Sequence, residues 1–203
     1  MSKTHPVSYM HALISSGHTL FGENYVQETL GKSPSLPPGV GIHFIGPLQS
    51  NKAVALVKGC RQLRVVETVC TEKVARLLQQ GAAAHRQGME KLGVYIQIDT
   101  SLEETKSGVE YNKIDDVNAL VDLIREGCPD LEFKGVMTIG LAGDDSCFDK
   151  LSALAEKIEA RLGFKIERSM GMSGDFEAAI KKGATSVRVG SSIFGARDYS
   201  EKK

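Results

Sequence analysis

Segments with strand character alternate along this chain with segments of helical periodicity. The strand candidates are LFGEN, IHFIG, LRVVETV, VYIQID, FKGVMT, IERSMGM and SVRVGSS. Apolar residues recur at the spacing of one helix face over residues 71–85, and similar patterns cover 114–124 and 148–162. Because strands and helices alternate, we expect a parallel sheet with right-handed crossovers. No linker is long enough to divide domains, so we expect a single domain over residues 1–203.

The predicted strands are one fewer than a (β/α)8 barrel needs. The missing strand should precede Lys3, because a helix is predicted over residues 6–16 with Pro6 in its first turn. Ser2, Lys3 and Thr4 would then lie at the carboxyl end of a strand whose body is absent. We therefore expect a TIM-type barrel with its first strand largely missing and with two unpaired strand edges.

Composition excludes several classes of function. The 203 residues carry 25 basic and 25 acidic side chains, and this balance argues against a nucleic-acid partner. The apolar runs are too short to span a bilayer, and no secretory signal is recognisable, so we expect a cytoplasmic protein, or an organellar one if a segment precedes this sequence. The cysteines stand far apart, so we expect four free thiols, at Cys60, Cys70, Cys128 and Cys147. The histidines form no cluster, so we expect no metal site.

Two successive strand candidates near the end of the sequence run into glycine and serine. Loops of this composition leave backbone N–H groups free beside hydroxyls, and this combination can hold a phosphate. In (β/α)8 barrels the loops after strands seven and eight often form such a grip. The alternative is that both are ordinary turns at helix starts. A lysine beside such a grip, here Lys3, suggests a Schiff base with a phosphorylated aldehyde, whereas the plainer interpretation is a solvated terminal lysine.

Several longer motifs resemble one family over essentially the whole chain. They are SKTHP (2–6), FGENYVQE (21–28), HFIGPLQSNK (43–52), ETKSGV (104–109), GVMTIG (135–140), SMGMSGDFEAAI (169–180) and VRVGSSIFGARDY (187–199). This set is similar to the pyridoxal phosphate homeostasis protein family. The resemblance implies a barrel like the N-terminal domain of alanine racemase (fold type III) that binds pyridoxal 5'-phosphate. It also implies a carrier or regulator of the vitamin B6 pool without established catalysis, with B6-dependent apoenzymes as candidate partners.

The resemblance also assigns roles to individual residues. Lys3 corresponds to the Schiff-base lysine, and His5 stands where the family usually has lysine. Asn24 corresponds to an asparagine that faces the barrel mouth, and a helix-capping role before Tyr25 is compatible with this. The remaining cofactor-binding candidates lie in the last two strand motifs: Met170, Ser173, Arg188, Gly190 and Ser191. Arg188 is expected to face an anion or acceptor, either the pyridine nitrogen or the phosphate.

Two other functions stay open at this point. A racemase-like enzyme would need a second base opposite Lys3, and no tyrosine or cysteine lies in a motif that clearly supplies it. A cofactor-free paralogue is the other alternative, because the first strand is missing. The expected state is a monomer or a weak dimer.

Overall fold

The structure is a computed structural model that describes residues 1–102, 107–141 and 143–195 of the chain. Within these residues one sheet has the strand order β1-β2-β3-β4-β6-β7-β8, with the short β5 paired to β4, and all pairings are parallel. The strands are β1 (Leu20–Glu23), β2 (Gly41–Phe44), β3 (Leu63–Val69), β4 (Leu92–Asp99), β5 (Val109–Glu110), β6 (Leu131–Met137), β7 (Glu167–Met172) and β8 (Ser186–Arg188).

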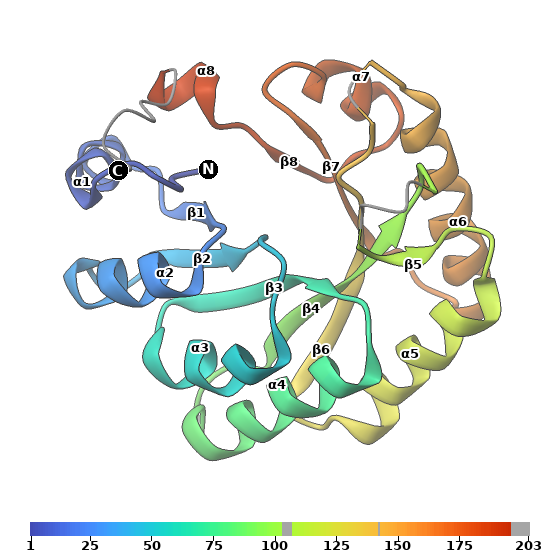
Figure 1. Cartoon of the computed structure of the whole chain (residues 1–203), viewed down its shortest axis with the longest axis horizontal. Coiled ribbons are helices and arrows are strands. Elements are labelled where there is room, and N and C mark those ends of the chain that lie inside the picture. The colour runs from blue at the N-terminus through green and yellow to red at the C-terminus, as the bar shows by residue number, and fades with distance from the viewer. Residues whose placement is uncertain (103–106, 142, 196–203) are drawn as a thin grey trace.

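Helices connect the strands and lie outside the curved sheet (Figure 1). They are α1 (Val7–Ser15), α2 (Val26–Lys32), α3 (Ala53–Gly59), α4 (Glu72–His85), α5 (Ile114–Gly127), α6 (Ser146–Leu162), α7 (Phe176–Lys181) and α8 (Ser191–Phe194), with 3-10 turns at Ser33–Ser35 and Ser50–Lys52. This is the predicted TIM-type barrel, and every strand predicted from the sequence is present. The prediction omitted β5 and α8, which are only two and four residues long.

The helices follow from local sequence signals. In α4 the hydroxyl oxygen of Thr71 accepts a hydrogen bond from the Val74 N–H group at 3.3 Å, which caps the helix. The apolar residues Val74, Leu78 and Ala82 of this helix are buried, as the predicted helix face requires.

Strand side chains alternate between two environments. The main apolar core includes residues from both strands and helices, such as Val66, Val94, Leu151 and Met170. A second, small cluster inside the barrel consists of Val65, Tyr95 and Met137. Polar side chains share this interior, so the barrel is filled but only partly apolar.

The sheet does not close between β8 and β1. No strand lies between them in the described part of the chain. The N-terminal end of the chain lies here (Figure 1). The Met1 nitrogen donates to the Val189 carbonyl and the Ser2 N–H group donates to the Gly22 carbonyl at 3.0 Å, so this short segment contacts both edges.

Within the described residues, no helix has the length and apolar character needed to cross a membrane. None of the four cysteines forms a disulfide. In the same ranges, histidine, cysteine, aspartate and glutamate side chains form no group of three suited to a metal ion.

Candidate functional site

Lys3 lies in a tight turn between α1 and the first two residues, Met1 and Ser2. The His5 N–H group donates to the Ser2 carbonyl at 3.2 Å, and Thr4 has a φ angle of 66°. A β-branched residue in this left-handed region is strained. Such strain costs about 1–3 kcal/mol and persists only where surrounding contacts hold it.

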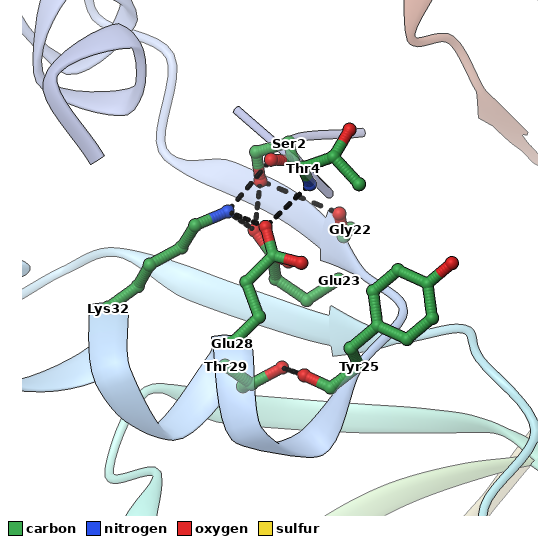
Figure 2. A network of polar contacts seen from close by, with 8 residues as sticks. All are labelled: Ser2, Thr4, Gly22, Glu23, Tyr25, Glu28, Thr29 and Lys32. Carbon is green, nitrogen blue, oxygen red and sulfur yellow. Dashed lines mark hydrogen bonds and ion pairs between the residues drawn. The ribbon is translucent and has the colours of Figure 1, made fainter. Parts of the chain in front are cut away.

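Polar side chains from β1 and α2 supply those contacts (Figure 2). The Lys32 ammonium donates to the Ser2 carbonyl at 2.8 Å, and the Thr4 N–H group donates to the Glu28 carboxylate. Lys32 also pairs with Glu23 at 2.8 Å and with Glu28 at 2.6 Å. The Ser2 hydroxyl donates to the Glu23 carboxylate at 2.6 Å. We call Glu23, Glu28 and Lys32 the Lys32 cluster.

The Lys32 cluster is largely buried. The Glu23 side chain is 0% exposed, Lys32 is 9% exposed and Glu28 is 22% exposed. Burial raises the pKa of Glu23, and the hydrogen bond from Lys32 acts in the opposite direction. Glu28 and Lys32 stand four residues apart on α2, the spacing at which opposite charges meet on one helix face.

The loops after β7 and β8 meet, as a phosphate grip requires. The Gly190 N–H group donates to the Ser173 hydroxyl oxygen at 2.9 Å. The first loop is folded by Asp175, whose carboxylate accepts from the Met172 N–H group. Ser173 and Gly190, which are 17 positions apart, therefore lie side by side.

The donors around this contact suit a phosphate. The N–H groups of Gly174, Ser191 and Ser192 have no acceptor among the described residues, and the two serine hydroxyls have no hydrogen-bond partner there. Free backbone N–H groups beside hydroxyls are a donor set that binds phosphate oxygens. Pyridoxal phosphate fits these loops in the chemistry of its phosphate group.

The turn that holds Lys3 lies beside these loops. Met1 is bonded to Val189, which immediately precedes Gly190, and these two bonded residues are 188 positions apart. The rings of His5 and Phe194 stack with their centroids 5.1 Å apart. The two regions predicted to hold the aldehyde and the phosphate are thus brought together by contacts between the first and last described segments.

Arg188 is buried inside the barrel and has acceptors there. Its guanidinium donates to the Ser169 hydroxyl oxygen at 2.8 Å and to the Thr138 carbonyl at 2.6 Å. The Ser169 hydroxyl donates to Glu67, whose other carboxylate oxygen lies 2.6 Å from the His43 ring nitrogen. Burial lowers the pKa of Arg188, and Glu67 opposes that shift. The acceptors of Arg188 among the described residues are protein groups, and its contact with the pyridine nitrogen or the phosphate stays a prediction.

Two predicted residues need separate description. Asn24 directly follows β1. Its carbonyl oxygen would lie 1.8 Å from a Cβ atom added to Gly46, so position 46 has no room for a side chain. The predicted capping role of Asn24 is wrong, because the N-cap residue of α2 is Tyr25 and no side chain caps that helix. Met170 is fully buried in the main core. The cofactor contacts of Asn24 and Met170 stay predictions.

Sequence reasoning missed several polar partners. Glu67 and Ser169 hold Arg188 from inside the barrel, and Lys32 and Glu28 hold the Lys3 turn. For Glu67 the signal was a carboxylate that follows two valines within the strand LRVVETV. For Lys32 it was the spacing to Glu28 on a helix.

Comparison with known proteins first shows the class of barrel to which the chain belongs. Residues 4–198 match the family described as alanine racemase, N-terminal domain. The alanine racemase of Clostridium difficile 630 has the same fold, with a TM-score of 0.74 over 96% of this chain and 51% of that chain, at 16% identity. The chain is therefore a barrel of the alanine racemase N-terminal type.

Closer relatives narrow the class. The pyridoxal phosphate homeostasis protein of Schizosaccharomyces pombe is 42% identical over 203 residues, which cover 97% of this chain and 82% of that protein. PipY of Synechococcus elongatus PCC7942, solved with pyridoxal phosphate bound, has a TM-score of 0.80 at 27% identity, covering 96% of this chain and 90% of that one. This chain belongs to the pyridoxal phosphate homeostasis protein family, as its motifs predict.

Proposed function

We propose that this protein binds pyridoxal 5'-phosphate and takes part in intracellular homeostasis of that cofactor. The observation that carries the proposal is the hydrogen bond between Gly190 and Ser173, which joins the loops after β7 and β8 beside the Lys3 turn. The similarity to PipY, solved with the cofactor, supports the same conclusion.

Each site residue has a role in this proposal. When bound, pyridoxal phosphate supplies an aldehyde that condenses with a primary amine and releases water. Lys3 is the proposed amine, and Ser173, Gly190 and Ser191 are the proposed phosphate ligands. Arg188 is fixed inside the barrel, where it orients the bound group through its remaining donors.

The finer parts of the proposal follow from the sequence. We propose one domain over residues 1–203, in a monomer or weak dimer in the cytoplasm, which passes cofactor to B6-dependent apoenzymes. Activation of a purified apoenzyme by the loaded protein, faster than by an equal amount of free cofactor, would support transfer.

We propose binding without turnover. Racemisation needs a second acid–base group on the face opposite Lys3. Tyr95, inside the barrel, is engaged with Glu167 through a hydrogen bond of 2.6 Å, and burial raises the pKa of its hydroxyl. We expect no exchange of the α-hydrogen of amino acids with deuterated water beyond that produced by free cofactor. Exchange that disappears in Lys3→Ala would contradict this.

The binding proposal is tested by titrating the protein with pyridoxal phosphate and recording visible absorbance. We expect a saturable new band for the wild type and for Lys52→Ala, a control lysine in the 3-10 turn Ser50–Lys52. Lys3→Ala should show no such band. Pyridoxal, which lacks the phosphate, should bind at least about tenfold more weakly, because each charged hydrogen bond contributes about 1.5–3 kcal/mol. A normal band in Lys3→Ala would refute the assignment of Lys3.

A further inference from the structure

We infer that the Lys32 cluster is a positioning device for Lys3. It holds the backbone on both sides of Lys3 and so aims that side chain at the grip formed by the loops after β7 and β8. The inference rests on the proposed function only where it assigns the cofactor aldehyde to Lys3.

The contacts of the cluster flank Lys3 directly. Lys32 binds the carbonyl of Ser2, the residue before Lys3, at 2.8 Å. Glu28 accepts from the N–H group of Thr4, the residue after it. Both bonds go to backbone atoms, and Lys32 joins the two contacts because it also binds Glu28 at 2.6 Å. The path of the chain through Lys3 is therefore fixed from both sides (Figure 2).

The turn requires such a restraint. Thr4 has a positive φ of 66°, and its buried hydroxyl oxygen has no hydrogen-bond partner among the described residues. A strained, poorly satisfied residue relaxes unless its surroundings hold it. Side chains of β1 and α2 provide the restraint, because Lys32 and Glu28 bind the backbone of Ser2 and Thr4.

The same contacts occupy the amine of Lys32 itself. An ammonium group has three N–H donors, and Lys32 donates to Ser2, Glu23 and Glu28. Its side chain is only 9% exposed. Lys32 therefore does not compete with Lys3 for an aldehyde, although both lie near the carboxyl end of β1.

The contribution of the Lys32 cluster to folding stability does not by itself explain why these charges are buried. Burying charges costs desolvation energy that offsets much of their attraction, and apolar side chains of similar size often stabilise a protein as well. Glu23 is fully buried, and one of its oxygens has no hydrogen-bond partner in the described part of the chain. The Lys32 cluster provides directed contacts to Ser2 and Thr4, which apolar side chains could not make.

The main variant is Glu23→Gln/Lys32→Met, which removes the Lys32 contacts to Ser2 and Glu28 without leaving Glu23 charged and unpaired. Glu28→Gln is a milder variant that keeps the pair between Glu23 and Lys32. Glu159→Gln is the matched control. Glu159 is also buried and binds Lys165 at 2.8 Å and Arg168 at 3.1 Å, beside the amino end of β7 rather than the carboxyl end.

Two measurements separate positioning from general stability. The first is the rate at which saturating pyridoxal phosphate is captured covalently by Lys3, followed by borohydride reduction and peptide mapping. The second is the affinity for pyridoxine 5'-phosphate, which carries the phosphate but no aldehyde. In the double variant we expect capture to slow by about tenfold or more, since misplacement of about 1 Å can cost on the order of 100-fold. The affinity for pyridoxine 5'-phosphate should change less than about twofold, because its phosphate ligands are untouched.

The cofactor-free protein gives an independent readout. Lys32→Met removes the partner that holds the Glu28 carboxylate beside the Thr4 N–H group. Hydrogen exchange of that N–H group should therefore accelerate about tenfold or more in the double variant and remain unchanged in Glu159→Gln. If the double variant does not fold, Glu28→Gln should show the same changes to a smaller extent. Unchanged capture and exchange in a folded double variant, or equal slowing in Glu159→Gln, would overturn the inference. Absence of Lys3 capture in the wild type would instead refute the proposed function, and Thr4 exchange would still test the clamp.

Discussion

Arg188 illustrates how the barrel fixes a charged side chain before any ligand arrives. Its two hydrogen bonds go to Ser169 on β7 and to Thr138 directly after β6, so the guanidinium plane cannot turn freely. Glu67 supports Ser169 from the opposite side. Ser191 differs from Arg188, because its hydroxyl and N–H group have no partner among the described residues. The site therefore combines one rigid cation with donors that remain available.

The availability of Ser191 gives a prediction at this scale. Ser191→Asp should weaken binding of pyridoxal phosphate by several kcal/mol, because a carboxylate would face the phosphate dianion in a partly desolvated site. Ser191→Asn, which has a similar size and no charge, is the control and should lose much less affinity. Fluorescence or absorbance titration at low salt measures both. Equal affinities for wild type and Ser191→Asp would mean that Ser191 does not contact the phosphate.

At the scale of elements, the position of the grip depends on how closely β7 approaches α7. Gly171 lies within β7 with a φ of 91°, and a Cβ atom added there would lie 2.6 Å from the Cβ atom of Ala179 on α7. The loop that carries Ser173 begins two residues later. A larger residue at 171 would push the strand and the helix apart and would move that loop.

Gly171→Ala should therefore reduce the free energy of unfolding by about 1–3 kcal/mol, the usual cost of overpacking, with an added cost for a side chain at positive φ. Gly174→Ala is the matched control, because a Cβ atom there would meet no heavy atom within 4 Å and no positive φ is recorded. Urea denaturation of both variants measures the difference. Equal stability of the two alanine variants would show that β7 and α7 are not packed so tightly.

At the scale of the whole molecule, the site depends on the meeting of the first and last described segments. Met1 reaches Val189 and His5 stacks on Phe194, so the Lys3 turn and the grip lie beside each other. A cleft of about 270 Å³ is lined by Met1, Glu67 and Arg188 among others. This cleft therefore reaches the polar interior of the barrel.

The regular elements were predictable from the sequence because their signals are local. The apolar periodicity of α4 and the β-branched run of β3 each lie within one window of the chain. The loops after β7 and β8 were also predictable from their glycine and serine content. The two-residue strand β5 was missed, since so short a segment carries no periodicity.

The polar partners could not be predicted in the same way. Ser169 and Glu67 are 102 positions apart, and Arg188 and Thr138 are 50 positions apart, so only the folded sheet shows that they meet. The contacts of Lys32 with Ser2 likewise depend on how α2 packs beside the Lys3 turn. Strand alternation indicates which face a residue occupies, but it does not identify its neighbour across the barrel.

The most direct test of the central claim is to identify the residue that holds the cofactor. The protein is saturated with pyridoxal phosphate, reduced with borohydride, digested and mapped by mass spectrometry. We predict the label on Lys3 in the wild type and in the neutral control Lys52→Ala, and its loss when free phosphate-bearing competitor displaces the cofactor before reduction. Label distributed over surface lysines, or concentrated at a lysine other than Lys3, would contradict a site built from the Lys3 turn and the loops after β7 and β8.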